Sequence, residues 1–183
     1  FTNLENVGFA FPEFLKSYPK SYKACPFLSD LAQLEWNLVN SFYAPFEKNY
    51  ETSFLSQLHS DDWPKLVVEL SKSVILMHSN WPLDKIWKSS RVKSYHPEKT
   101  WLLIYRNLNE DAVFKKLSSL ESVVIGKLVQ GQTLGRICKY VSSIQAEKIP
   151  GLFSNWAANG IVTSFRIKTS ARRKSTSSGL SKL

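Results

Sequence analysis

The stretch "WLLIYRNLNEDAVFKKL" (residues 101–117) holds two apolar runs on either side of a polar turn. Residues 101–107 are rich in aromatic and branched side chains, "LNED" follows, and residues 112–117 are apolar again. Two such runs joined by a short polar turn are typical of a β-hairpin. We therefore expect an antiparallel hairpin here, and the remaining chain has to cover it.

The residues after the hairpin predict short helices and a closing strand. Ser118 or Ser119 caps the first helix and Gly131 ends it, Thr133 caps the second, and Gly160 ends the third. The predicted elements are helices over 118–131, 132–143 and 149–160 and a strand over 161–167. This order describes a winged-helix-like module over residues 91–167.

The part of the chain before the hairpin, residues 1–90, is predicted to be mainly helical. "PFLSDLAQLEWNLVNSFY" (residues 26–43) has the helical period, and residues 65–79 fit both a strand and a helix, of which we prefer extended structure. Shorter helices are expected over 11–18, 51–63 and 82–89. The predicted fold class is α+β, with a mainly helical N-terminal half and a winged-helix-like module with a small antiparallel sheet.

Glu35 is an anomaly in the helix over residues 26–43. At about 100° per residue it falls near the centre of the apolar arc. A lone buried carboxylate is costly unless it is paired or hydrogen-bonded, so Glu35 has a partner, is protonated, or the helix is less buried than its pattern suggests. The paired alternative predicts that Glu35→Ala costs about 3 kcal/mol or more.

The net charge of +9 is concentrated at the C-terminus. From Arg166 onward there are basic residues and no acids, and residues 168–183 form a Ser/Thr-rich basic tail. Such a tail is either simply solvated or binds nucleic acid or an acidic partner.

Bulk features predict a cytoplasmic protein without a membrane span. No apolar run approaches the length that a bilayer requires, and no signal peptide is evident. Cys25 and Cys138 lie in apolar surroundings, so we expect buried, reduced thiols. The chain starts at Phe1 and Met77 is its one methionine, so we expect its true start to be missing.

Catalytic signatures are missing from the sequence. The histidines are scattered, there is no CxxC or HExxH, and no nucleophile motif or phosphate loop occurs. We therefore expect neither a metal site nor catalytic residues, and the chain is predicted not to be an enzyme.

A winged-helix-like module reads DNA or captures a peptide. The predicted third helix has no Lys or Arg, so DNA binding would depend on the basic tail. Peptide capture needs an open strand edge with apolar pockets beside it, although aromatics at helical spacing also fit a core. The candidate peptide-binding residues are Val113, Phe114, Phe153, Trp156, Ile161, Val162 and Phe165.

Short blocks between Phe11 and Phe165 resemble the partner proteins of multinuclear non-haem iron oxidative enzymes, a family once labelled as DNA-binding. The matching positions are Phe11-Pro12, Tyr18-Pro19, Asp30, Leu34-Glu35-Trp36, Ile86-Trp87, Glu121, Gly131, Thr133-Leu134 and Gly160. Two departures are the absence of the family's additional N-terminal helical domain and the presence of Ser71-Lys72 where the family has His-Pro. A compact chain of this kind resembles the C-type subunits of methanobactin biosynthesis.

The resemblance implies a non-catalytic subunit of a heterodimer. Its companion would be an iron-dependent barrel enzyme that oxidises cysteines of a ribosomally made precursor peptide to oxazolone and thioamide groups, as in the biosynthesis of the copper chelator methanobactin. This chain would help to present the leader of the precursor, and the iron would lie on the enzyme. The residues expected at the enzyme interface, or in a structural role, are Asp30, Glu35, Trp36, Ile86 and Trp87.

Overall fold

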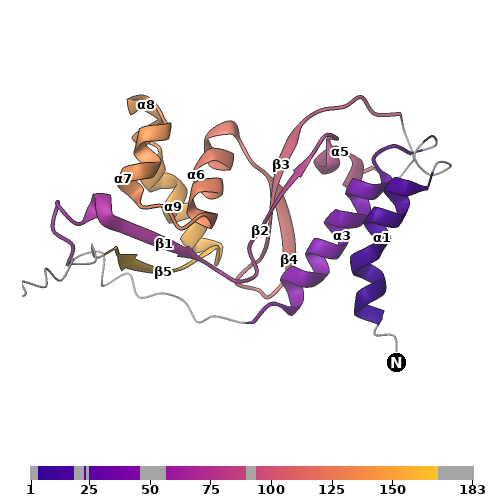
Figure 1. The fold of residues 1–183 in the computed structure, drawn as a ribbon. Helices are drawn as coiled ribbons and strands as arrows, with labels where there is room; N and C mark the ends of the chain where they lie inside the picture. Colours follow the sequence, from indigo (N-terminus) through magenta and orange to yellow (C-terminus); the bar gives the residue numbers. More distant parts are fainter. Residues whose placement is uncertain (1–3, 19–22, 24, 46–56, 90–93, 169–183) are drawn as a thin grey trace, which may run out of the picture.

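The computed structural model describes residues 4–18, 23, 25–45, 57–89 and 94–168, and for residues 4–7 only the backbone. The described elements are helices and antiparallel strands (Figure 1). They are α1 (Leu4–Ser17), α3 (Leu28–Tyr43), η1 (Trp63–Lys65), β1 (Leu66–Leu70), β2 (Ile75–Ser79), α5 (Leu83–Trp87), β3 (Thr100–Arg106), β4 (Ala112–Lys116), α6 (Ser119–Val129), α7 (Leu134–Ile137), η2 (Cys138–Tyr140), α8 (Ser143–Ala146), α9 (Ile149–Ala158) and β5 (Val162–Ile167).

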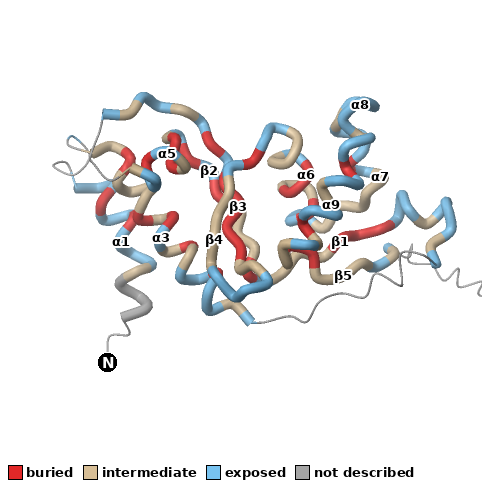
Figure 2. The backbone as a smooth tube through the Cα atoms, turned by 180° about the vertical axis from the view of Figure 1, so that it is seen from behind, coloured by how far each residue is buried: buried red, intermediate tan, exposed pale blue. Residues whose placement is uncertain are grey.

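The predicted hairpin is confirmed as β3 and β4, and β2 completes a three-stranded antiparallel sheet in the order β2-β3-β4. Ile104 of the central strand pairs with Ile75 on one side and Phe114 on the other. Because β3 lies between two strands and is covered on both faces, its inner residues are buried in succession (Figure 2).

The two faces of β3 belong to two hydrophobic cores. Leu103 and Tyr105 pack with residues of α6, α9 and β5. Leu102 and Ile104 pack with residues of α3 and α5. Alternate side chains of a strand point to opposite faces, so this one strand joins the helical N-terminal part to the C-terminal helices.

A second antiparallel sheet consists of β1 and β5 among the described strands. Leu66 pairs with Ile167, and Val68 pairs with Phe165. The expectation of extended structure over residues 65–79 is confirmed by β1 and β2. The predicted domain boundary at residue 90 thus falls between strands that pair across it.

The helix start at Ser118 and the helix end before Gly160 agree with those expected from the sequence. Ser118 forms a capping box with Glu121 at the start of α6, and Gly160 has a positive φ of 74° after α9. The second predicted helix is shorter than expected, because α7 ends at Ile137 and passes into the 3-10 turn η2. The predicted α+β class, mainly helical at the N-terminal end and with a small antiparallel sheet, is confirmed.

The N-terminal helices pair with each other and α3 lies on the sheet β2-β3-β4. The predicted helix over 11–18 is part of the longer α1, and the predicted helices over 26–43 and 82–89 are found as α3 and α5. Residues 51–56 of the predicted 51–63 helix lie outside the described residues, and the part from 57 to 62 contains turns.

The buried side of α3 differs from the side that periodicity predicts. Leu34, Asn37 and Ser41 are buried, whereas Val39 and Phe42 are exposed. The Gln33 side chain donates a hydrogen bond to Asn37 Oδ1 (3.0 Å), which satisfies a buried amide oxygen. Periodicity locates an apolar arc, but the helices and sheet packed against it determine which part of the arc is covered.

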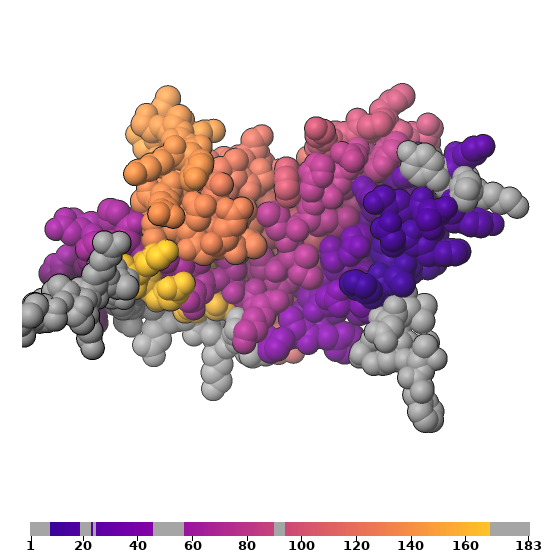
Figure 3. Space-filling view, viewed as in Figure 1, coloured from indigo at the N-terminus to yellow at the C-terminus, as the bar shows by residue number. Residues whose placement is uncertain are grey.

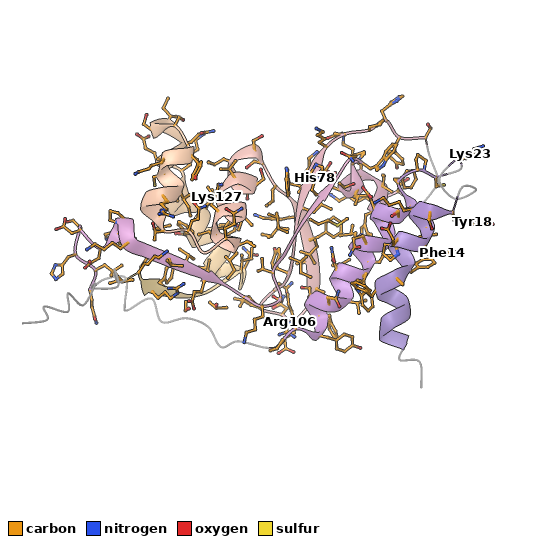
Figure 4. The ribbon with its side chains drawn as sticks, in the orientation of Figure 1. Phe14, Tyr18, Lys23, His78, Arg106 and Lys127 are labelled. Atoms are coloured by element: carbon orange, nitrogen blue, oxygen red, sulfur yellow. The ribbon has the colours of Figure 1, made fainter. Side chains whose placement is uncertain are left out.

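The two ends of the molecule are built from different helices. Figure 1 shows α1, α3 and α5 at one end and α7, α8 and α9 at the other, with the β2-β3-β4 sheet between them, and Figure 3 shows the indigo N-terminal part and the orange C-terminal part on opposite sides of the molecule. Arg106 ties β3 to the end of α3 by donating from Nη1 to the carbonyl oxygen of Phe42 (2.8 Å) (Figure 4). In the part of the chain described, no helix has both the length and the apolar character that a bilayer span requires.

Candidate functional site

The outer edge of β4 is open in the described structure. There β4 pairs with β3 alone, so alternate backbone N–H and C=O groups on its other side have no strand partner. A cavity of about 460 Å³ runs beside this strand, between it and α3 and α5. We call this cavity the β4 groove, and its lining residues are Leu38, Asp84, Trp87, Lys88, Ala112, Val113, Phe114, Lys115 and Lys116.

Aromatic side chains form one wall of the β4 groove. Trp87 lies edge-on to Phe114 with ring centroids 5.5 Å apart, and 44% of Trp87 is exposed. Phe114 packs partly against the core below α3, and Val113 packs against the core on the opposite face of the sheet. The groove thus offers backbone hydrogen-bonding groups beside apolar surface, the combination that an extended peptide requires.

Lysines on β4 hold the strand to its neighbours. Lys115 donates to Glu121 Oε1 on α6 (2.8 Å), and Lys116 donates to Glu98 Oε1 (2.6 Å). Glu98 also accepts from Lys85 on α5 (2.7 Å). The hydrogen bonds from Lys116 and Lys85 lower the pKa of Glu98 to about 2. These ion pairs connect the C-terminal end of β4 to α6 and, through Glu98, to α5.

Three of the residues expected at an enzyme interface, Asp30, Trp36 and Ile86, make contacts within the fold. Asp30 Oδ2 accepts a hydrogen bond from the buried Ser79 hydroxyl (2.6 Å). Ile86 is buried in the core below α3. Trp36 is half-buried against α1, where a Cβ on Gly8 would collide with its ring.

Glu35 and Trp87 are the two members of that predicted set that are exposed. The alternative in which Glu35 is buried and paired is wrong, because the covered side of α3 bears Leu34 and Asn37 instead. The predicted loss of about 3 kcal/mol for Glu35→Ala, which rested on a buried carboxylate, no longer applies. Of the alternatives, the structure favours a helix that is less buried at Glu35 than its pattern indicates.

An exposed row of aromatic rings on α1 was missed at the sequence level. Phe11, Phe14 and Tyr18 stack in order, with centroids 6.4 Å and 5.7 Å apart, and Figure 4 shows Phe14 and Tyr18 pointing away from the molecule. The buried side of the same helix instead carries Pro12 and Leu15. The sequence does carry one indication of this row: the α1 segment has apolar residues on more than one side, and one partner helix cannot cover all of them.

The other peptide-binding candidates divide into two groups. Trp156, Ile161 and Val162 are buried in the core with α6, so they do not face a ligand. Phe153 and Phe165 are partly exposed and line a second cavity, which lies between α7, α9 and the β1-β5 sheet. The prediction therefore placed seven residues in one site where the structure has two grooves and a core.

The expectation of a buried Cys138 is also wrong. Cys138 is exposed and lines the second cavity, because α7 ends one residue before it and the chain turns. Cys25 is half-buried. No cluster of three or more His, Cys, Asp or Glu side chains that could hold a metal ion occurs among the residues that the structure describes.

Comparison with known proteins adds no relative to these observations. No protein-family model matches this sequence, and a search of curated proteins finds no match either.

Proposed function

We propose that this protein is a non-catalytic subunit that holds an extended peptide for a partner enzyme. The observation that carries the proposal is the β4 groove, in which an open strand edge lies beside Trp87 and Phe114. An added strand would pair with the backbone of β4 and place alternate side chains against these rings. This kind of recognition uses both the open edge and the apolar wall.

The partner in this proposal is an iron-dependent barrel enzyme, and the peptide is the leader of a ribosomally made precursor. The support is the resemblance of the sequence blocks to partner proteins of iron oxidative enzymes, as in methanobactin biosynthesis. The enzyme would oxidise cysteines to oxazolone and thioamide groups, and the heterodimer would be cytoplasmic. The resemblance implies that the iron lies on the enzyme, so the proposal assigns the metal and the oxidation to that chain.

The docking surface for the enzyme in this proposal includes Glu35 and Trp87. Both are exposed on the α3 and α5 side of the molecule. The stacked rings of Phe11, Phe14 and Tyr18 add apolar surface on the neighbouring α1. Exposed apolar patches of this kind mark protein interaction sites.

Co-expression with such an enzyme and its precursor peptide tests the proposal. We expect co-elution of the two chains and oxidation of the peptide, measured by mass spectrometry, only when both are present. Because Trp87 is also assigned to the docking surface, peptide binding is measured on this chain without the enzyme. Trp87→Ala should weaken that binding by about tenfold or more, since it removes the exposed ring from the groove wall. Trp63→Ala is the matched control, because Trp63 is 42% exposed but lines the other groove.

Two results would contradict the proposal. One is separate elution together with oxidation that needs only the enzyme. The other is peptide binding that Trp87→Ala and Trp63→Ala weaken equally. The alternative, nucleic-acid binding through the basic tail, predicts salt-dependent binding of duplex DNA that is lost when residues 168–183 are deleted.

A further inference from the structure

A second groove lies at the opposite end of the molecule from the β4 groove. It has a volume of about 500 Å³ and opens between α7, α9, η1 and the β1-β5 sheet. We call it the α9 groove, and its lining residues are Trp63, Pro64, Leu66, Leu134, Gly135, Cys138, Ala146, Ile149, Pro150, Phe153, Ser154 and Phe165. The volume is in the range of cavities that enclose ligands.

The floor and walls of the α9 groove are largely apolar. Leu66 and Ile149 are buried at its base, and 42% of Trp63 is exposed at its side. Gly135 brings α7 close to η1, since a Cβ there would lie 2.8 Å from atoms of Pro64. An apolar side chain that enters this space would leave water without displacing any element of the fold.

The surface around the α9 groove is basic. Residues 122–168 contain one acidic residue, Glu147, and six basic ones, which are Lys127, Arg136, Lys139, Lys148, Arg166 and Lys168. Arg136, Lys139 and Lys148 are exposed, and each is a direct chain neighbour of a groove-lining residue.

Two of the cations near the groove are already paired with acids, and an exposed acidic side chain also lies near it in the chain. Arg166 Nε donates to Glu69 (2.7 Å), and Lys65 is paired with Asp62 (3.2 Å). Asp61 is an exposed acid close to Trp63 in the chain. The charge excess that remains among the described residues is positive, because Arg136, Lys139 and Lys148 are exposed beside the groove.

We infer that the α9 groove binds an acidic polypeptide segment that inserts bulky apolar side chains. The apolar walls accept the side chains, and the surrounding cations attract acids that flank them. A nucleic acid fits less well, because the polar edges of bases that enter the groove would lose hydrogen bonds to water against walls that are largely apolar. This inference is independent of the β4 groove and of the iron enzyme, because it concerns binding by this chain alone.

Selection from a random-peptide display library on the purified chain tests the inference. We expect enriched peptides that combine Asp or Glu with bulky apolar residues. Ser154→Trp should weaken the selected peptides by about tenfold or more, because Ser154 lines the groove and is exposed on α9. Asn155→Trp is the matched control, since Asn155 is exposed on the same helix and does not line the groove.

Two charge-reversal variants test whether the basic side chains beside the groove attract the acidic peptide. Arg136→Glu, Lys139→Glu and Lys148→Glu together should weaken binding of the selected peptides strongly and lower its salt dependence. Lys16→Glu, Lys23→Glu and Lys99→Glu together add the same negative charge at exposed positions that do not line the groove, and should leave binding nearly unchanged.

Each contrary result overturns the inference. These results are no enrichment, enrichment without acidic residues, or equal effects of Ser154→Trp and Asn155→Trp. Binding of a labelled 20-nucleotide DNA (single- or double-stranded) that Ser154→Trp abolishes would also overturn it, because the groove would then be a nucleic-acid site.

Discussion

The hydrogen bond between Ser79 and Asp30 connects the N-terminal helices to the sheet, and its removal has a measurable cost. Ser79 Oγ donates to Asp30 Oδ2 (2.6 Å) and accepts from the backbone N–H of Trp81 (3.0 Å). Ser79 is 1% exposed, so water cannot replace it without a rearrangement. The single hydroxyl therefore joins the first turn of α3 to the end of β2.

Ser79→Ala removes both of these hydrogen bonds. A hydrogen bond to a charged group contributes about 1.5–3 kcal/mol, and a buried donor left without an acceptor costs about 1–3 kcal/mol. Because Asp30 is half-buried and can recover some water contact, we expect a loss of about 3 kcal/mol in the free energy of unfolding, below the upper sum of these ranges.

Ser41→Ala is the matched control for this change. Ser41 is also a buried serine, but its hydroxyl has no hydrogen-bond partner among the described residues. Its removal should change the free energy of unfolding by less than about 1 kcal/mol, since no bond is lost.

Urea unfolding followed by tryptophan fluorescence measures these changes. A double-mutant cycle with Asp30→Ala and Ser79→Ala should give a coupling energy of about 1–2 kcal/mol. Equal losses for Ser79→Ala and Ser41→Ala, or a coupling energy near zero, would refute the assignment of Asp30 to a structural bond.

Three further predictions follow from other contacts. Lys116 and Lys85 hold the pKa of Glu98 at about 2, below its ordinary value of 4.5. The contribution of the Glu98 carboxylate to stability is therefore present above pH 4.5 and is lost as the pH falls toward 2. The difference in melting temperature between the wild type and Glu98→Gln should shrink over that interval. Ser118→Ala should cost about 1 kcal/mol in chemical unfolding by breaking the capping box of α6, whereas Ser119→Ala, one position along, should cost less. Glu35→Ala should leave the free energy of unfolding within about 0.5 kcal/mol, because the side chain is exposed, and a larger loss would show that Glu35 has a buried partner.

The sequence predicted the local elements well where short-range chemistry determines them. The turn between β3 and β4, the cap at Ser118 and the end of α9 before Gly160 depend on residues within a few positions of one another. For the same reason, residues 65–79 were identified as extended from their branched side chains.

The candidate sites were predicted only in part. Trp87, Val113 and Phe114 were singled out separately, and the structure brings them together in the β4 groove. Trp156 looked equally suitable, but it is 0% exposed in the core. An aromatic residue at helical spacing serves a core and a groove equally well, so sequence pattern cannot separate the two.

By itself the sequence determined the α+β class, the hairpin and the helix ends, because these follow from periodicity and local hydrogen bonding. Only the tertiary structure decided that β1 pairs with β5 and that β3 serves two cores, because both depend on residues far apart in the chain. It also decided that Glu35 is exposed and that Phe153 and Phe165 belong to a different groove from Phe114. Which side of an element is covered depends on the partner packed against it, and that partner is not encoded in the element's own period.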